Sequence, residues 1–194
     1  MSNAFMLGNG KSRLEYNITS LKNYGTVYGC NALYRDFIPD HLVAVDPPML
    51  KEIVEQGIPE KTNVWSNPRK ANEKYKNVNF FRPGKGWSSG PTALWMACER
   101  KHTKIYILGF DYASIDKKLN NVYGSTDNYK DKNAVYTFFG NWERQTMECI
   151  TSYKTIKFYR ILTEKYTFIP DKLAHISNLK HINIHEFKDR FPQI

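Results

Sequence analysis

Short apolar runs of four to six residues alternate along this chain with segments of helical periodicity, and this alternation constrains the fold more than any other feature. Such an order is typical of β/α units built around a mostly parallel sheet. It predicts strands at 4–7, 26–30, 41–45, 62–65, 78–81, 104–108, 156–159 and 181–183, and helices at 17–22, 48–56, 90–101, 141–153 and 184–190. We therefore expect residues 1–194 to form a single α/β domain with a mostly parallel sheet and helices on both of its faces.

The composition is that of an ordinary globular chain. With 194 residues, 41% of them hydrophobic, the chain is long enough to bury a core without a metal or a disulfide. No stretch approaches the roughly 18 consecutive apolar residues of a membrane span. The three cysteines are an odd number at wide spacing, and an apolar strand begins at once with no leader before it. These features predict a cytoplasmic protein without a membrane span, and they leave its oligomeric state open.

The chain is basic, with a net charge of +9 and a pI near 9.3. Its lysines and arginines are spread along the whole sequence, and no block of five or six like charges occurs. A positive field of this kind either keeps the surface solvated or attracts an anionic partner such as a nucleotide or a nucleic acid. Both interpretations stay open at this point.

The stretch Gly8-Asn9-Gly10-Lys11-Ser12 directly follows the first apolar run, so it predicts a tight polar turn at the end of a strand. In open α/β sheets, ligands lie beyond the carboxyl ends of the strands, and glycines let them approach the main chain. The turn is neither a complete dinucleotide motif nor a P-loop, because Arg13 takes the third glycine position and no Gly-Lys-Ser/Thr ending follows. It therefore indicates either a nucleotide or phosphate site or a tight strand-to-helix connection.

A second candidate site is the helix opening Ser88-Ser89-Gly90-Pro91. Serine or glycine before a helix with proline in its first turn is a strong start signal. The free N–H groups and the positive dipole end of such a helix favour an anion such as phosphate. The alternative is that the serines only cap the helix.

Polar residues also follow three other predicted strands. Asn31 follows the second strand, Asp46 the third, and Asp111-Tyr112 the strand at 104–108. An asparagine amide both donates and accepts hydrogen bonds, and an aspartate can contact a ribose, act as a base or cap a loop.

The segment 112–139 is rich in Asn, Asp, Lys, Tyr and Gly and has no sustained period, so it predicts a long irregular loop. Structureless loops longer than about 15 residues are usually functional lids or disordered. Its tyrosines, Tyr123 and Tyr129 among them, favour a lid that becomes ordered on a ligand.

Together these positions resemble the bacterial lipooligosaccharide sialyltransferases and the related Rossmann-like domain of the motility accessory factor and archaeal hydroxymethylpterin pyrophosphokinase proteins. Residues 8–12 are similar to the family's Gly-Asn-Gly-Pro-Ser turn, and residues 30–34 to its Cys-Asn-x-x-Tyr segment. Residues 88–90 are similar to its Thr-Ser-Gly helix opening, and 108–112 to its Ser-Gly-x-Asp-Phe-Tyr strand end. The four motifs occur in the family's order over most of residues 4–160, and the resemblance implies a Rossmann-like fold, a GT-A-like variant of the α/β class.

The resemblance implies a metal-independent transferase that uses a nucleotide-activated sugar and passes it to a glycan or another small acceptor, with no further cofactor. It implies that Asn9 and Asn31 contact the nucleotide, and that Tyr123 or Tyr129 binds the departing phosphate. The residues assigned to nucleotide binding are Gly8, Asn9, Gly10, Lys11, Ser12, Asn31, Asp46, Ser88, Ser89, Gly90 and Tyr112, and those assigned to catalysis are Asp111, Tyr123 and Tyr129.

The chain also departs from that family. No histidine lies between His102 and His175, where these sialyltransferases have their general base, so an aspartate such as Asp111, Asp127 or Asp131 would have to replace it. Lys11 replaces the proline of the turn, and Asp46 stands where the family presents an asparagine, which leaves CMP or another nucleotide open as the donor.

The chain contains no Asp-x-Asp pair, so metal-held nucleotide-sugar chemistry has no evident ligands, and the histidine spacing does not indicate a metal site. Diphosphate transfer to a pterin-like alcohol is a further option within the same fold. A nucleic-acid-binding protein and a degenerate accessory protein of the same fold are the non-enzymatic alternatives.

Overall fold

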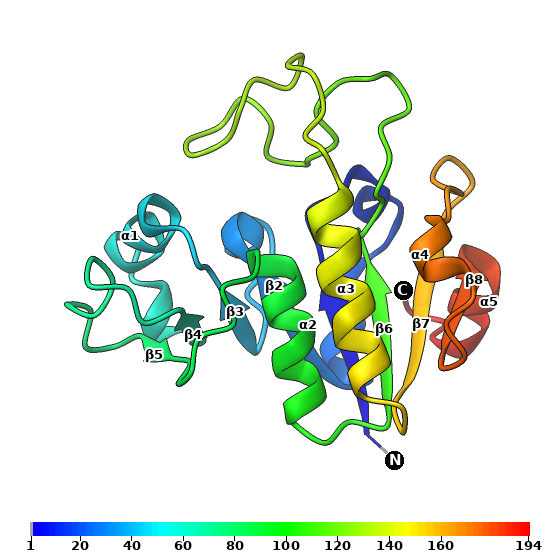
Figure 1. The fold of residues 1–194 in the computed structure, drawn as a ribbon, viewed down its shortest axis with the longest axis horizontal. Helices are drawn as coiled ribbons and strands as arrows, with labels where there is room; N and C mark the ends of the chain where they lie inside the picture. Colours follow the sequence, from blue (N-terminus) through cyan, green and yellow to red (C-terminus); the bar gives the residue numbers. More distant parts are fainter. Residues whose placement is uncertain (1) are drawn as a thin grey trace.

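A computed structural model describes residues 2–194 and contains one eight-stranded sheet (Figure 1). The strands are β1 (Asn3–Leu7), β2 (Thr26–Cys30), β3 (His41–Val43), β4 (Asn63–Ser66), β5 (Asn79–Phe80), β6 (Lys104–Leu108), β7 (Lys157–Leu162) and β8 (Leu179–Asn183). Their order across the sheet is β5-β4-β3-β2-β1-β6-β7-β8, and every neighbouring pair is parallel. The predicted fold class is confirmed, with a sheet that is parallel throughout.

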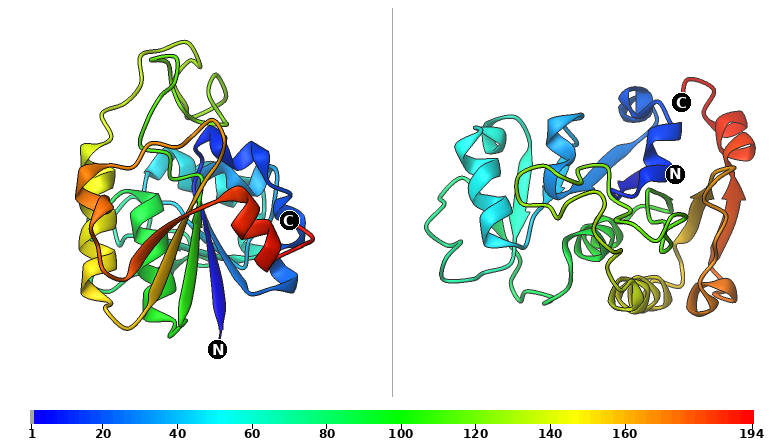
Figure 2. Two further views of the ribbon diagram at one scale, coloured as in Figure 1. Left: turned by 90° about the vertical axis from the view of Figure 1, so that its right-hand side faces the viewer. Right: turned by 90° about the horizontal axis from the view of Figure 1, so that it is seen from above.

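Helices cover both faces of the sheet (Figure 2). The α-helices are α1 (Pro47–Glu55), α2 (Ser89–Glu99), α3 (Gly140–Ser152), α4 (Asp171–Ala174) and α5 (Ile184–Arg190). Side chains alternate between the faces along a strand, and in β1 Phe5 packs into the core that holds α1 and α5. The neighbouring Met6 packs into the core that holds α2 and α3. Each face of the sheet is therefore buried under its own apolar layer.

The predicted strands are all present, whereas one predicted helix has a different form. Residues Ile18–Asn23 form a 3-10 helix, as do Lys11–Glu15, Asn31–Arg35 and Ile58–Glu60. A 3-10 turn is short and has no sustained 3.6-residue period, so its sequence carries little signal. The connection from β1 to β2 is consequently made of two 3-10 helices.

The order of the strands reverses direction at β1. The chain runs outward from β1 through β2, β3 and β4 to β5, and then returns to β6 on the other side of β1. In open α/β sheets, the crevice beyond the carboxyl ends at such a reversal is the usual place for a ligand. The topology therefore directs attention to the ends of β1 and β6.

The lid segment, residues 112–139, connects β6 to α3 and lies over this edge of the sheet (Figures 1 and 2). Its inner part is packed onto the domain: Tyr123 is buried, and the Val122 N–H donates to the Asn9 carbonyl at 2.8 Å. Lys118 and Val135 form an antiparallel bridge within the segment. The segment is irregular as predicted, and its inner part is packed against the turn after β1.

Within residues 2–194, no helix has the length and apolar character that crossing a membrane requires.

Candidate functional site

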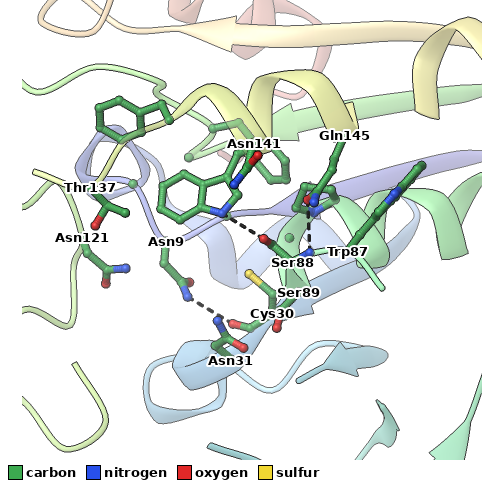
Figure 3. A pocket seen from close by; sticks show the side chains of 18 of the residues that line it. Asn9, Cys30, Asn31, Trp87, Ser88, Ser89, Asn121, Thr137, Asn141 and Gln145 are labelled. Atoms are coloured by element: carbon green, nitrogen blue, oxygen red, sulfur yellow. Dashed lines mark hydrogen bonds between the residues drawn. The ribbon is translucent and has the colours of Figure 1, made fainter. Parts of the chain in front are cut away.

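A cavity of about 490 Å³ opens at the carboxyl ends of the central strands (Figure 3). Ten of the fourteen residues predicted for the site line it: Gly8, Asn9, Gly10, Asn31, Asp46, Ser88, Ser89, Gly90, Asp111 and Tyr112. The turn after β1 and the amino end of α2 thus reach one cavity, although about 80 residues separate them in the sequence. The other four, Lys11, Ser12, Tyr123 and Tyr129, lie outside its lining.

The amino end of α2 is held by α3 (Figure 3). The Trp142 Nε1–H donates to Ser88 Oγ, and the Ser88 N–H donates to Gln145 Oε1, both at 3.1 Å. Ser89 Oγ accepts from the Val45 N–H at 3.1 Å, which ties the helix to the end of β3. The serines thus have structural partners, but these partners lie in α3 and after β3, and the Ser88 side chain makes no capping hydrogen bond within α2.

Two N–H groups at this helix end remain free to bind an anion. The first residues of a helix have no acceptor within it, and among the described residues neither the Ser89 nor the Gly90 N–H donates a hydrogen bond. Pro91 has no N–H to satisfy. Because the positive end of the helix dipole lies at the same place, an anion is favoured there.

The glycines of the turn after β1 are needed for packing against the loop after β6. The Gly8 N–H donates to the Leu108 carbonyl at 2.8 Å, and the Gly10 N–H donates to the Gly109 carbonyl at 3.0 Å. A Cβ atom on Gly8 would lie 2.7 Å from Phe110 Cδ2, and one on Gly10 would lie 2.7 Å from the Gly109 oxygen. The turn is therefore a backbone-to-backbone contact first, and the close approach that glycine allows here is made by the protein itself.

Asp111 is an anchor for its loop. Its Oδ2 accepts from the Ser12 N–H at 3.1 Å and from Asn120 Nδ2 at 3.0 Å, and its Oδ1 accepts from the Ser12 hydroxyl. Behind it, the buried Arg160 donates to the carbonyls of Phe110 at 2.8 Å and Asp111 at 3.1 Å. The carboxylate is buried and accepts three hydrogen bonds from the protein, so Asp111 has a structural role in holding its loop.

Asp46 is a carboxylate of a different kind. It precedes α1, its side chain makes no capping hydrogen bond, and it is exposed while lining the cavity. Asp127 and Asp131, the other aspartates considered as bases, do not line the cavity.

Two asparagine amides approach the cavity from the ends of β1 and β2 (Figure 3). Asn9 Nδ2 donates to the Cys30 carbonyl at 3.2 Å, and its Oδ1 accepts from Arg13 at 3.4 Å. Asn31 has a left-handed backbone with φ of 52°, and its buried Oδ1 has no partner within the described residues. A buried acceptor without a donor is costly, and a strained non-glycine residue often marks a functional site.

The lid tyrosines lie behind the cavity wall. The Tyr123 hydroxyl donates to Asp36 Oδ2 at 2.7 Å and accepts from Arg13 at 2.9 Å, and burial raises its pKa. The Tyr129 hydroxyl is 3.4 Å from Asn9 Nδ2, and burial raises its pKa as well. Both hydroxyls therefore stay protonated, and both support the residues around Asn9 without lining the cavity.

The remaining predicted residues have structural contacts too. The buried Tyr112 donates its hydroxyl to Thr146 Oγ1 of α3 at 2.7 Å. The Lys11 N–H donates to Asn120 Oδ1 at 2.8 Å. Tyr112 therefore contributes its ring to the region of the cavity and its hydroxyl to the packing of α3.

One wall of the cavity was not predicted from the sequence. Phe139, Trp142 and Gln145 line it from the start of α3, and Arg69 lines it from the loop after β4. Phe139 and Trp142 pack with ring centroids 5.7 Å apart. Trp142 and Gln145 are three residues apart on a predicted helix, so the sequence could have predicted that they lie on the same face of that helix.

One cysteine lies at this site. Cys30 lines the cavity, but burial raises its pKa to about 12, so the thiol stays protonated at neutral pH. Residues 2–194 contain no group of three or more His, Cys, Asp or Glu side chains arranged to hold a metal ion.

Comparison with known proteins gives no relative: no protein-family model, no curated protein and no solved structure matches this chain.

Proposed function

We propose that the protein binds a nucleotide-activated sugar in this cavity and acts as a metal-independent, glycosyltransferase-like transferase. The observation that carries the proposal is the meeting of the amino end of α2, with its two free N–H groups, and the polar ends of β1 and β2 at one cavity. The N–H groups of Ser89 and Gly90 would bind the phosphate, and the amide of Asn31 would receive a hydrogen bond from the base or the sugar.

The charges around the cavity support a donor with a single phosphate. Arg69 is the one cationic side chain among its lining residues, and it is exposed. Asp46 and Asp111 line the same cavity and oppose the accumulation of negative charge. A diphosphate or triphosphate would need more cations than this, whereas one phosphodiester can be stabilised by two N–H groups and one arginine.

In the reaction we propose, an acceptor hydroxyl attacks the anomeric carbon of the bound sugar, the bond from that carbon to the phosphate oxygen breaks, and the nucleotide leaves with the bonding electrons. The developing charge on the phosphate is stabilised by the N–H groups at α2. Asp46, the exposed carboxylate of the cavity, would accept the proton of the hydroxyl.

Thermal unfolding in the presence of CMP, UDP, GDP and ADP tests the binding step. Binding to the folded state stabilises it by about 2.7 kcal/mol at a ligand concentration of 100 times Kd. The substitution Asn31→Gly keeps the left-handed backbone and removes the amide, so it should reduce this stabilisation, whereas Asp127→Ala, outside the cavity, should leave it unchanged. A screen in which no nucleotide stabilises the wild-type protein would refute the proposal.

A non-catalytic binding protein is the second candidate. The Asp111 carboxylate is engaged in hydrogen bonds, so of the two carboxylates in the cavity lining Asp46 alone is available as a base. Turnover distinguishes the two. For a transferase, nucleotide release from the matching sugar nucleotide should fall at least 100-fold in Asp46→Asn while nucleotide binding is retained. Binding without release in the wild type would instead favour the accessory protein.

A further inference from the structure

The large apolar side chains that are exposed in residues 2–194 all lie in segments that follow the carboxyl end of a strand. They are Leu14, Ile115, Val135, Tyr136, Phe138 and Phe168. Leu14 follows β1, Phe168 follows β7, and the other four belong to the lid segment after β6. Because the strands are parallel, these segments leave the sheet at the same edge, which is also the edge where the cavity opens.

The four apolar residues of the lid segment come from two stretches, residues 115–118 and 135–138, that lie side by side. Lys118 pairs with Val135, and the Tyr136 N–H donates to the Lys117 carbonyl at 3.3 Å. Val135 is 75% exposed and Phe138 is 77% exposed, and both lie in the last residues of the lid segment before α3. The ring of Tyr136 stacks on Phe139, which lines the cavity, with centroids 5.5 Å apart. The exposed apolar residues 135–138 are thus next to a wall of the cavity.

Lysines accompany these apolar residues on the same segments. They are Lys11, Lys117, Lys118, Lys130, Lys132 and Lys165, and the acidic residues there are Glu15, Asp116, Asp127, Asp131 and Glu164. The local excess of positive charge is small, but the whole protein carries +9. Exposed apolar side chains on separate loops, with lysines on the same loops, are typical of a surface that binds a lipid membrane. The apolar side chains can insert between the lipid headgroups, and the lysines can contact the phosphates.

We propose that this edge of the molecule docks on an anionic lipid surface, with Phe138, Val135 and Ile115 inserted into the interface and the lysines at the lipid phosphates. The net charge of the protein brings it to the surface, and the apolar side chains then add affinity in proportion to the area that they bury. The cavity would open toward the membrane, so its acceptor would be presented at or near the lipid surface. The docking itself does not depend on the proposed function.

Cosedimentation with vesicles tests the docking. We compare vesicles of phosphatidylcholine alone with vesicles that contain one third phosphatidylglycerol, at low salt. We expect binding to the anionic vesicles and at least tenfold weaker binding to the neutral ones. The double substitution Val135→Ser with Phe138→Ser should weaken anionic binding about tenfold or more, since each side chain loses its buried area. Both residues are exposed, so the thermal unfolding of the free protein should not change.

Two double charge variants distinguish docking through the lid segment from attraction of the whole positively charged protein to the vesicle. Lys117→Glu with Lys118→Glu changes the charge of the lid, and Lys154→Glu with Lys157→Glu makes the same change at the amino end of β7, on the opposite edge of the sheet. The lid pair should weaken binding about thirtyfold, at roughly 1 kcal/mol for each lysine near the surface. The control pair should weaken it about twofold.

An equal loss of vesicle binding in the two double charge variants would overturn the proposal. An absence of wild-type binding to anionic vesicles would overturn it as well. Dimerisation that Val135→Ser with Phe138→Ser abolishes, without any vesicle binding, would assign the edge to a second copy of the chain instead. A nucleotide-induced thermal shift in that variant that equals the wild type would show that its cavity is intact. Loss of vesicle binding with an intact shift therefore separates this proposal from the proposed function.

Discussion

Two glycine-containing segments meet at the cavity, and they differ in what fills the space beside each glycine. A Cβ atom on Gly8 or Gly10 would lie less than 3.0 Å from the loop after β6. A Cβ atom on Gly90, at the amino end of α2, would lie 3.4 Å from its nearest neighbour, Phe110 Cζ, which is ordinary van der Waals contact. The first segment is thus closed by protein, and the second is open to the cavity.

The difference shows that a glycine motif and a ligand site need not coincide. Gly8 and Gly10 have the spacing of a nucleotide-binding turn. The space that a side chain would take at these positions is, however, occupied by the loop that contains Gly109. Gly90 belongs to a less conspicuous motif, and no contact within the described residues requires it to be glycine. If both segments served the ligand alone, substitutions in either would affect binding and leave stability unchanged.

The largest effect is expected for Gly10→Ala. The new Cβ would overlap the Asp111 carboxylate and the Gly109 carbonyl, which are backbone or fixed by hydrogen bonds and cannot move aside cheaply. We expect a loss of at least about 3 kcal/mol in the free energy of unfolding. Urea denaturation measures it, and a loss below about 1 kcal/mol would contradict the packing role of this turn.

A smaller loss is expected for Asp111→Asn. The amide has the shape of the carboxylate, and its oxygen can still accept from the Ser12 N–H and Asn120, but its NH₂ group forces the Ser12 hydroxyl to turn and replaces a charge-assisted hydrogen bond by a neutral one. Losing the charge on a buried acceptor of three hydrogen bonds should reduce the free energy of unfolding by about 1 to 2 kcal/mol. The exposed Asp46→Asn is the control and should change stability by less than about 0.5 kcal/mol. Equal stability of the two variants would show that Asp111 is not an anchor.

The smallest effect on stability is expected for Gly90→Ala. Alanine is the better helix former by up to about 1 kcal/mol, and its Cβ has room next to Phe110. Stability should stay the same or rise slightly, while the methyl group, placed beside the free N–H groups, should weaken nucleotide binding at least tenfold. Calorimetric titration with the nucleotide found in the thermal screen provides the measurement. Unchanged affinity would show that the ligand does not approach α2.

Much of the fold could be predicted because the apolar runs mark the strands directly. Each of the eight strands lies within a few residues of its predicted position, and α2 and α3 begin one residue before their predicted starts. The 3-10 helices were harder to predict, because segments as short as Lys11–Glu15 and Asn31–Arg35 are too short to show a helical period in the sequence. The four-residue helix α4 was missed for the same reason.

The candidate site was predictable where it follows a strand or opens a helix, as at Asn31 and Ser89. It was not predictable where an irregular segment sets the geometry. Tyr123 and Tyr129 lie behind the cavity because the lid segment packs against Arg13, Asp36 and Asn9, and no local pattern encodes those contacts. The role of Asp111 depended likewise on Asn120, which reaches it from the same segment.

The direct continuation of the lid segment into α3 has a mechanical consequence. Gly140 starts α3 just after the lid ends, and within the next two turns Trp142 and Gln145 hold Ser88. Any swing of the segment that carries Gly140 along would pull on the end of α2 that carries the two free N–H groups. For the proposed transferase, uncovering the cavity and loosening its contacts with a bound phosphate would then be a single movement, so that release of the spent nucleotide would accompany opening.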